Sequence, residues 1–408
     1  MRFKYTVLSL GMLVLAGCGG SGGTGSVSDA CNELTDESFS CATMLTDLVV
    51  EAVIPTVATF EDNLVQLNTK VDEYCANIDN GEKLETAKLA WQAAMVPLQQ
   101  LQVMNFGPNA DLGNGLISFY DWETANPYSI DISIAKSVLF EDIELPPVDN
   151  EKDLVAIEYI LFAPSAVQAY TDPSKENSNV KKWREGSTGE NEIQKERCDY
   201  AKLITADMQH RAATLKSSWQ QFDLASVSSS KQVAANEVAQ ALFYIDNKTK
   251  DLKIKALLPQ PEQADSDSFN AAKVESYFAH VSKEHIIANL NGLKNIFTSN
   301  GNVGLDDYLS AVGQAQIATD MLTALDAAIS NAEAIDGSLF TALTDANGVD
   351  ACSTVAVTGL YDTDGESSDI VTLCALQANI KKLTDVLKFE MIPATSFTAP
   401  ASADGDND

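Results

Sequence analysis

The chain has 408 residues, a length typical of two or three domains, and 45% of them are hydrophobic, enough to build sizeable cores. Its 27 basic and 58 acidic residues give a net charge of −31. This charge argues against nucleic acid as a partner, since phosphate binding requires a basic surface, and it attracts cations and cationic partners instead.

The N-terminus is typical of a bacterial lipoprotein signal. Arg2 and Lys4 precede an apolar stretch, residues 5–17, that is too short to span a bilayer as a helix. The stretch ends in Leu-Ala-Gly-Cys, which resembles a lipobox, so Cys18 is expected to carry the lipid. Residues 1–17 would then be a signal peptide that is removed.

The segment that follows Cys18 is rich in glycine and serine, and we expect residues 18–41 to form a flexible tether and an N-terminal loop. Gly19, rather than aspartate, follows the cysteine, which favours sorting to the outer membrane, on its periplasmic or exterior face. The lipid anchor is the only membrane attachment expected, because no further membrane-spanning run is predicted.

Most of the remaining chain has apolar residues three and four apart, the spacing of amphipathic helices. Pro55 is expected to kink or split the first helix, residues 111–150 to form an irregular excursion with short helices, and residues 165–188 a polar loop. The predicted helices cover residues 42–78, 82–104, 151–163, 191–222, 231–258, 270–298, 304–332 and 367–390.

The pattern predicts an all-α protein with two tandem helical-bundle domains. The segment ASVSSS, which begins at Ala225, is the predicted junction between an N-terminal bundle, residues 42–224, and a C-terminal bundle, residues 225–392. Residues 393–408 are acidic and are expected to be disordered.

Six cysteines remain after Cys18, an even number that indicates disulfides in an exported protein. Fifteen connectivities are open to six cysteines. We favour one long-range pair that joins two helices and two pairs that close local loops: Cys75–Cys198, Cys31–Cys41 and Cys352–Cys374.

The segment DLVAIEYILF, from Asp153 to Phe162, is apolar almost throughout and carries one carboxylate, Glu158, at its centre. A helix that is apolar all round is buried. A buried carboxylate must be paired, protonated or bound to a cation. Glu158 is therefore either the partner of an arginine or lysine from a neighbouring helix, or a metal ligand.

Four segments, in this order, resemble the imelysin family: Ala90–Pro108, the LVAIEYILF segment, Arg197–Trp219 and Lys273–Phe297. The resemblance covers about residues 42–392. It implies two helical bundles that arose by duplication, export with a lipid anchor, classification with metallopeptidases and a link to iron uptake. It also implies a divalent metal or iron as the bound group, and iron-uptake or other envelope proteins as partners.

The family's G-x-H-x-x-E signature aligns with Asp153-Leu154-Val155-Ala156-Ile157-Glu158 and keeps only the glutamate. Histidine and glutamate three apart on a helix could reach one metal ion. Val155, at the histidine position, cannot ligate a metal. The resemblance therefore implies a tentative metal-binding role for Glu158 and no catalytic residue.

His280 and Glu284 are four apart within a predicted helix and are the weaker candidates for metal ligands. Their sequence, HVSKEH, is not the H-E-x-x-H pattern of zinc peptidases, and surface or interhelical hydrogen bonding is the alternative explanation. The same segment carries four polar residues that suggest a cleft between the domains, or else ordinary capping and interhelical bonds: Glu275, Ser276, Ser282 and Asn289.

The one basic cluster lies in DNKTKDLKIK and contains Lys250 and Lys253. It is expected either to form a solvated face that balances the neighbouring aspartates, or to supply the partner of a buried acid.

Together these features indicate an exported, imelysin-like lipoprotein that is a non-catalytic binding component linked to iron or other metal uptake. The alternatives are a metallopeptidase of the imelysin type and a surface partner-binding protein without metal binding.

Cys18→Ser should leave the chain without lipid and move it out of the membrane fraction, because the thiol is the acylated group. The measurement is metabolic labelling with a fatty acid, followed by fractionation. A variant that still takes up label and still sediments with membranes would show that Cys18 is not the anchor.

Overall fold

The computed structural model describes most of the chain between residues 31 and 401. The described ranges are 31, 39–111, 116, 119–124, 126–140, 145–146, 151–163, 177–187, 189–227, 230–258, 270–344 and 369–401. All regular secondary structure within these ranges is helical, so the predicted all-α class is confirmed. Cys18 and the predicted signal peptide lie outside the described residues.

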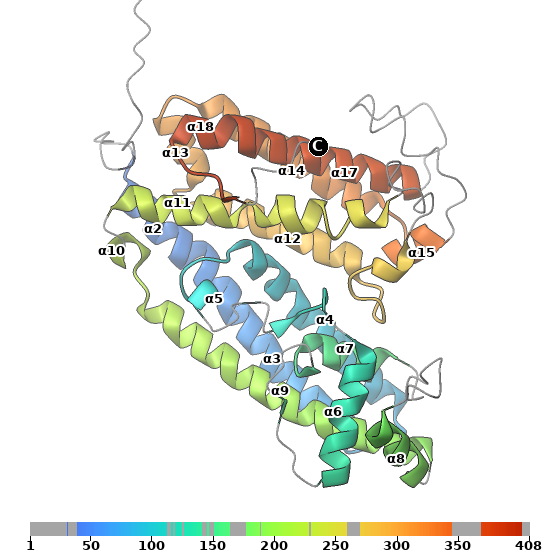
Figure 1. The fold of residues 1–408 in the computed structure, drawn as a ribbon. Helices are drawn as coiled ribbons and strands as arrows, with labels where there is room; N and C mark the ends of the chain where they lie inside the picture. Colours follow the sequence, from blue (N-terminus) through green and yellow to red (C-terminus); the bar gives the residue numbers. More distant parts are fainter. Residues whose placement is uncertain are drawn as a thin grey trace, which may run out of the picture.

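The first group of helices is built around α3, which packs against both α4 and α9 (Figure 1). The shorter α7 lies against α4 and α9, and α6 lies against α8. The helices of this group are α2 (Cys41–Asp47), the π-helix η1 (Leu48–Val53), α3 (Ile54–Cys75), α4 (Gly81–Val103), α5 (Pro108–Asp111), α6 (Pro127–Phe140), α7 (Leu154–Phe162), α8 (Ser178–Gly186) and α9 (Glu190–Gln221).

The second group is built around α12 and α14, with α17 against α14 (Figure 1). The division of the chain into two duplicated domains stays a prediction. The helices are α10 (Leu224–Val227), α11 (Lys231–Ala241), η5 (Ile245–Lys250), η6 (Lys255–Leu257), η7 (Ala271–Lys273), α12 (Ser282–Phe297), η8 (Ser299–Gly301), α13 (Leu305–Ala311), α14 (Ala315–Ala334), α15 (Leu339–Thr344), α17 (Asp369–Asp385), η10 (Val386–Met391) and α18 (Ile392–Thr395).

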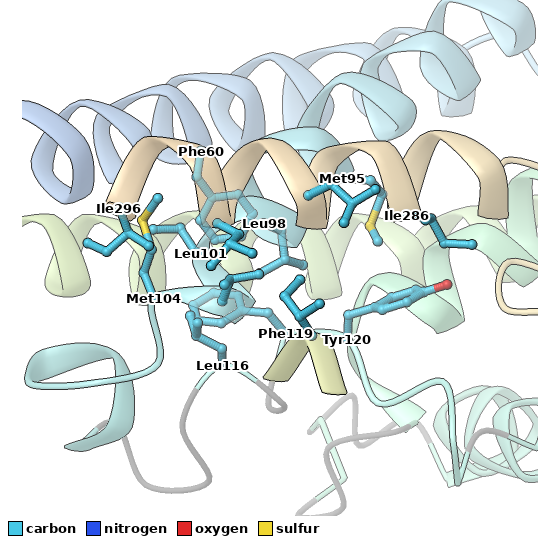
Figure 2. Packing of buried hydrophobic residues seen from close by; sticks show 14 of the residues in the cluster. Phe60, Met95, Leu98, Leu101, Met104, Leu116, Phe119, Tyr120, Ile286 and Ile296 are labelled. Atoms are coloured by element: carbon cyan, nitrogen blue, oxygen red, sulfur yellow. The ribbon is translucent and has the colours of Figure 1, made fainter. Parts of the chain in front are cut away.

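The two groups meet where α12 crosses α4. Gly292 lies at the crossing, and a Cβ atom there would be 2.7 Å from the Cα and carbonyl oxygen of Gln100, so only glycine permits this approach. Figure 2 shows the apolar side chains that fill the layer around the crossing: Phe60 from α3, Met95, Leu98 and Leu101 from α4, and Ile286 and Ile296 from α12.

Pro55 does not split the first helix, contrary to one expectation. It lies at the start of α3, directly after the π-helix η1. A π turn inserts an extra residue and so accommodates a proline that lacks an N–H donor without ending the helix. Pro393 follows the π-helix η10 in the same way.

The continuous helix Cys41–Cys75 is long and apolar enough to cross a membrane by length and composition, although no such run was predicted after the signal. Half of its most apolar window is buried. Because α3 packs between α4 and α9, we assign the helix to the core of the fold.

Several predicted boundaries are wrong for local reasons. The predicted loop 165–188 contains α8, which Asn177 caps by accepting a hydrogen bond from the Asn179 backbone N–H. The predicted helix 231–258 ends as an α-helix at Ala241 and continues as the π-helix η5. The predicted helix 270–298 begins only at Ser282, and a turn at Gly313 divides the predicted helix 304–332.

Two of the favoured disulfides form, Cys31–Cys41 and Cys75–Cys198. Cys374 is also disulfide-bonded, and its favoured partner Cys352 lies outside the described residues. The backbone N–H of Cys31 donates to Gln232 of α11, 3.1 Å away, and the Gln232 side chain donates to the Thr395 carbonyl oxygen at 3.3 Å. The start of α2, α11 and the end of α18 are thereby joined.

Removing the Cys75–Cys198 disulfide should destabilise the protein more than removing Cys31–Cys41, because it closes a loop of 123 residues rather than 10. We expect replacement of Cys75 and Cys198 by alanine to lower the free energy of unfolding by about 2 kcal/mol more than replacement of Cys31 and Cys41 by alanine. Urea titration of both variants measures this difference. Equal losses would mean that loop closure is not the source of the stabilisation.

Candidate functional site

A cavity of about 780 Å³ opens between α7 and two later stretches of the chain, Leu252–Ala256 and Ala272–Phe278. Its walls are mainly apolar and include five aromatic side chains, and its charged lining residues are Glu123, Glu158 and Lys273. The aromatic side chains are Tyr120, Trp122, Tyr159, Tyr277 and Phe278. A cavity of this size with few polar groups is typical of a site for a small organic ligand.

The start of α7 is fixed by Asp153. Its carboxylate accepts hydrogen bonds from the backbone N–H groups of Val155 (2.9 Å) and Ala156 (3.2 Å), as an N-cap does. It also accepts from the Asp121 backbone N–H at 2.6 Å, which holds Tyr120 and Trp122 beside α7. Asp153 stands at the glycine position of the imelysin-like signature and acts there as a helix cap.

Glu158 lies one turn further along α7, is 1% exposed and contributes to the cavity lining. Its Oε1 atom accepts three hydrogen bonds, from the backbone N–H groups of Phe278 and Ala279, both at 3.0 Å, and from the Ser276 hydroxyl at 3.2 Å. The donors belong to the Lys273–Phe297 segment, so the carboxylate links the two groups of helices.

The turn that holds Glu158 is strained. Ser276 and His280, at its two ends, have φ angles of +56° and +58°, the left-handed region that favours glycine. The His280 backbone N–H donates to the Ser276 carbonyl oxygen at 2.8 Å, which closes the turn. Strained residues persist only where their surroundings hold them, and here the carboxylate receives the backbone donors that the strained turn presents.

The expectation that Glu158 pairs with a lysine or arginine is wrong within the described part of the chain. Its partners there are neutral: the three donors to Oε1 and the Tyr120 hydroxyl, 3.4 Å from Oε2. Burial raises the pKa of Glu158 to about 7, although the hydrogen bonds from Ala279, Phe278 and Ser276 oppose this rise. Glu158 can therefore take up or release a proton near neutral pH.

A different buried acid of the Lys273–Phe297 segment, Glu275, does pair with a lysine. Its Oε2 atom lies 3.1 Å from Lys253 Nζ, and its Oε1 accepts from Gln99 of α4 at 2.9 Å. Burial alone would raise the pKa of Glu275, but Lys253 and His285 outweigh it and lower that pKa to about 2. Lys253 also donates to Gln99 at 2.6 Å and to Asn289 at 2.9 Å, which completes a polar network across the α4–α12 crossing.

The basic cluster is thus not a solvated face as a whole. Lys250 and Lys253 are each 1% exposed, and Lys250 pairs with the buried Asp246 at 3.0 Å. The second interpretation of the cluster, a partner for a buried acid, describes both lysines. The partners are Asp246 and Glu275, however, and not Glu158.

The four polar residues predicted to line a cleft are all buried. Ser276 lines the cavity, and Ser282 donates to the Glu275 carbonyl oxygen. Asn289 donates to the Gln99 carbonyl oxygen at 2.7 Å. Glu275 and Ser276 precede α12 rather than lying on it, so the four residues stabilise the contact of the helix groups from two different elements.

His280 and Glu284 do not form a pair on one helix. His280 lies in the turn before α12, is exposed and stacks on Phe340 with 4.2 Å between the ring centroids. Glu284 is exposed on α12, 3.8 Å from Lys283. Because His280 lies outside α12, the shared helix face on which the two residues were expected to act as joint ligands does not form.

The site residues do not fit a metal bound through the signature. Val155 lines the cavity and cannot ligate a metal, Glu158 Oε1 already accepts three hydrogen bonds, and Glu275 is engaged by Lys253. The described ranges hold no group of three or more histidine, cysteine, aspartate or glutamate side chains placed to bind a metal ion.

Sequence reasoning missed most of the cavity wall. Tyr120 and Trp122 fall in the irregular excursion, where aromatic residues between polar ones were the available signal. Tyr277 and Phe278 were assigned to a helix. Gln99 lies within the Ala90–Pro108 segment but was not singled out, although an amide on a packed helix requires a partner.

The sequence model of the family described as Imelysin matches residues 54–363 of the chain. No curated protein matches. Among solved structures, an imelysin-like protein from Psychrobacter arcticum 273-4 is similar with a TM-score of 0.63 at 15% identity, over 88% of this chain and 96% of that one. A candidate iron-regulated protein A precursor from Parabacteroides distasonis ATCC 8503 is similar with a TM-score of 0.60 at 17% identity, over 88% of this chain and 95% of that one.

The raised pKa of Glu158 predicts a pH dependence of stability. The folded state holds this proton up to about pH 7, whereas the unfolded state loses it near the ordinary glutamate pKa of 4.5. The free energy of unfolding should therefore fall as pH rises from about 4.5 to 7, by about 3 kcal/mol from this group.

Glu158→Gln should remove that part of the fall, as measured by urea titration at several pH values. Glu85→Gln, in an exposed pair with Lys88, is the matched control and should keep the wild-type slope. An unchanged slope in Glu158→Gln would contradict the assignment.

Proposed function

Because the chain belongs to the imelysin family, we propose that it is a non-catalytic binding component linked to iron or other metal uptake. The cavity beside Glu158 is the proposed binding site. The observation that supports this proposal is that Val155, which cannot ligate a metal, lines the cavity; the sequence resemblance aligns it with the histidine of the family signature.

A peptidase mechanism requires groups that this site does not combine. A catalytic zinc ion typically has three protein ligands and a water molecule, and the water needs a general base. Val155 cannot ligate, the Asp153 carboxylate is engaged as a helix cap, and Glu158 Oε1 is held by the Ser276–Ala279 turn. A binding role uses the same carboxylate without requiring further ligands.

The link to metal uptake rests on the family and on the relative from Parabacteroides distasonis, whose description names iron regulation. The net charge of −31 supports it, since an acidic surface concentrates cations. A lipid-anchored location at the outer membrane is part of the proposal. It rests on the lipobox-like sequence before Cys18, and the disulfides support an oxidising compartment.

The test is proteolysis. The purified full-length chain is incubated with unfolded protein substrates and with Zn²⁺ or Fe²⁺, and cleavage is followed by electrophoresis. We expect no cleavage above that of a mock purification. Cleavage by the wild type that disappears in Glu158→Gln would establish a peptidase and overturn the proposal.

Uptake is measured in parallel, as accumulation of radioactive iron by iron-limited cells with and without the protein. Cells that lack it should accumulate less iron, and Glu158→Gln should not restore accumulation as fully as the wild type does. Equal accumulation in all strains would contradict the link to iron.

A further inference from the structure

Glu158 differs from the other buried acids near the site. Glu275 is paired with Lys253, and Asp246 lies 3.0 Å from Lys250 and 2.6 Å from Lys388. Asp153 has neutral donors, but they are those of a helix cap, and it does not line the cavity. Glu158 lines the cavity and has only neutral partners within the described residues.

The two carboxylate oxygens of Glu158 are used unequally. Oε1 accepts three hydrogen bonds at 3.0 to 3.2 Å, whereas Oε2 has one contact, the Tyr120 hydroxyl at 3.4 Å. A carboxylate oxygen has room for a second donor. Oε2 is therefore the atom of this group that is left to interact with a ligand.

The walls around this carboxylate favour positive charge of an organic kind. Five aromatic side chains line the cavity, and the faces of such rings attract ammonium groups. A bare divalent metal ion, in contrast, needs several oxygen or nitrogen ligands, and the described residues do not group them here.

We propose that the cavity binds an organic cation, with its ammonium group at Glu158 Oε2 and its apolar part against the aromatic walls. This proposal names a ligand class for the proposed function, and it rests on that function because it treats the cavity as a binding site. Burial raises the pKa of Glu158 to about 7, and a bound cation would favour the ionised carboxylate.

The other charges that line the cavity are compatible with such a ligand. Glu123 is paired with Lys248 at 2.6 Å. Lys273 is exposed, and a lysine side chain can extend into solvent away from a bound cation. The acidic protein as a whole raises the local concentration of cations.

The test uses three benzyl probes that differ in charge: benzylammonium, benzyl alcohol and phenylmethanesulfonate. Binding to the full-length chain is measured by isothermal titration calorimetry at pH 8. We expect the cation to bind about tenfold more tightly than the alcohol, and the anion more weakly than both. Binding of the alcohol or the anion as tight as that of the cation would overturn the proposal.

Glu158→Gln keeps the size and the acceptor atom of the side chain but removes its charge. It should lower the affinity for the cation about tenfold and leave that for the alcohol unchanged. Glu284→Gln is the matched control, since it removes one charge from an exposed side chain outside the cavity lining. Equal affinity in wild type and Glu158→Gln would count against the proposal.

Tyr277→Leu covers the case in which Glu158→Gln fails to fold, because Tyr277 is 44% exposed and its loss leaves the core intact. It should weaken binding of the cation more than that of the alcohol. Absence of cation selectivity together with absence of proteolysis would disprove only this ligand class, whereas Glu158-dependent proteolysis would disprove the binding function itself.

Discussion

The close crossing of α4 and α12 is the contact on which the rest of the site depends. Gly292 permits the approach, and the Lys253–Glu275 pair, held by Gln99 and Asn289, satisfies the polar groups buried there. Removing one partner of such a pair leaves an uncompensated buried charge, so the network is sensitive to any single change. Because Glu275 directly precedes Ser276, the same network sets the position of the turn that reaches Glu158.

The turn and the acid stabilise each other. Without the carboxylate, the N–H groups of Phe278 and Ala279 would lose the acceptor on which both converge, and unsatisfied buried donors are costly. Without the strained residues Ser276 and His280, those two groups would not converge on one oxygen. Glu158 thus has a structural role through its Oε1 atom, whereas its Oε2 atom has fewer hydrogen-bond partners.

The sequence was informative where periodicity decides the structure. The helical class and the burial of Glu158 follow from apolar spacing. Periodicity could not reveal that Val274 to Val281 form a turn, because their apolar residues pack against α7 and the cavity rather than along a helix. It also could not identify Glu275 as the partner of Lys253, since that choice depends on a long-range crossing.

Pro55 and Asp153 illustrate a second limit. A proline in a helical pattern and an aspartate in place of glycine both look disruptive, yet a π turn accommodates the first and the second caps a helix. Both residues are accommodated by the local backbone geometry, which cannot be predicted from the residue type alone. The identities of the cavity residues were visible in the sequence, and their convergence was not.

The junction at Cys31 has a mechanical consequence. A tension applied to the chain ahead of Cys31 would pass through a covalent bond to Cys41 and through Gln232 to Thr395, so it would be divided among α2, α11 and α18. The fold is therefore built to resist force from its N-terminal side.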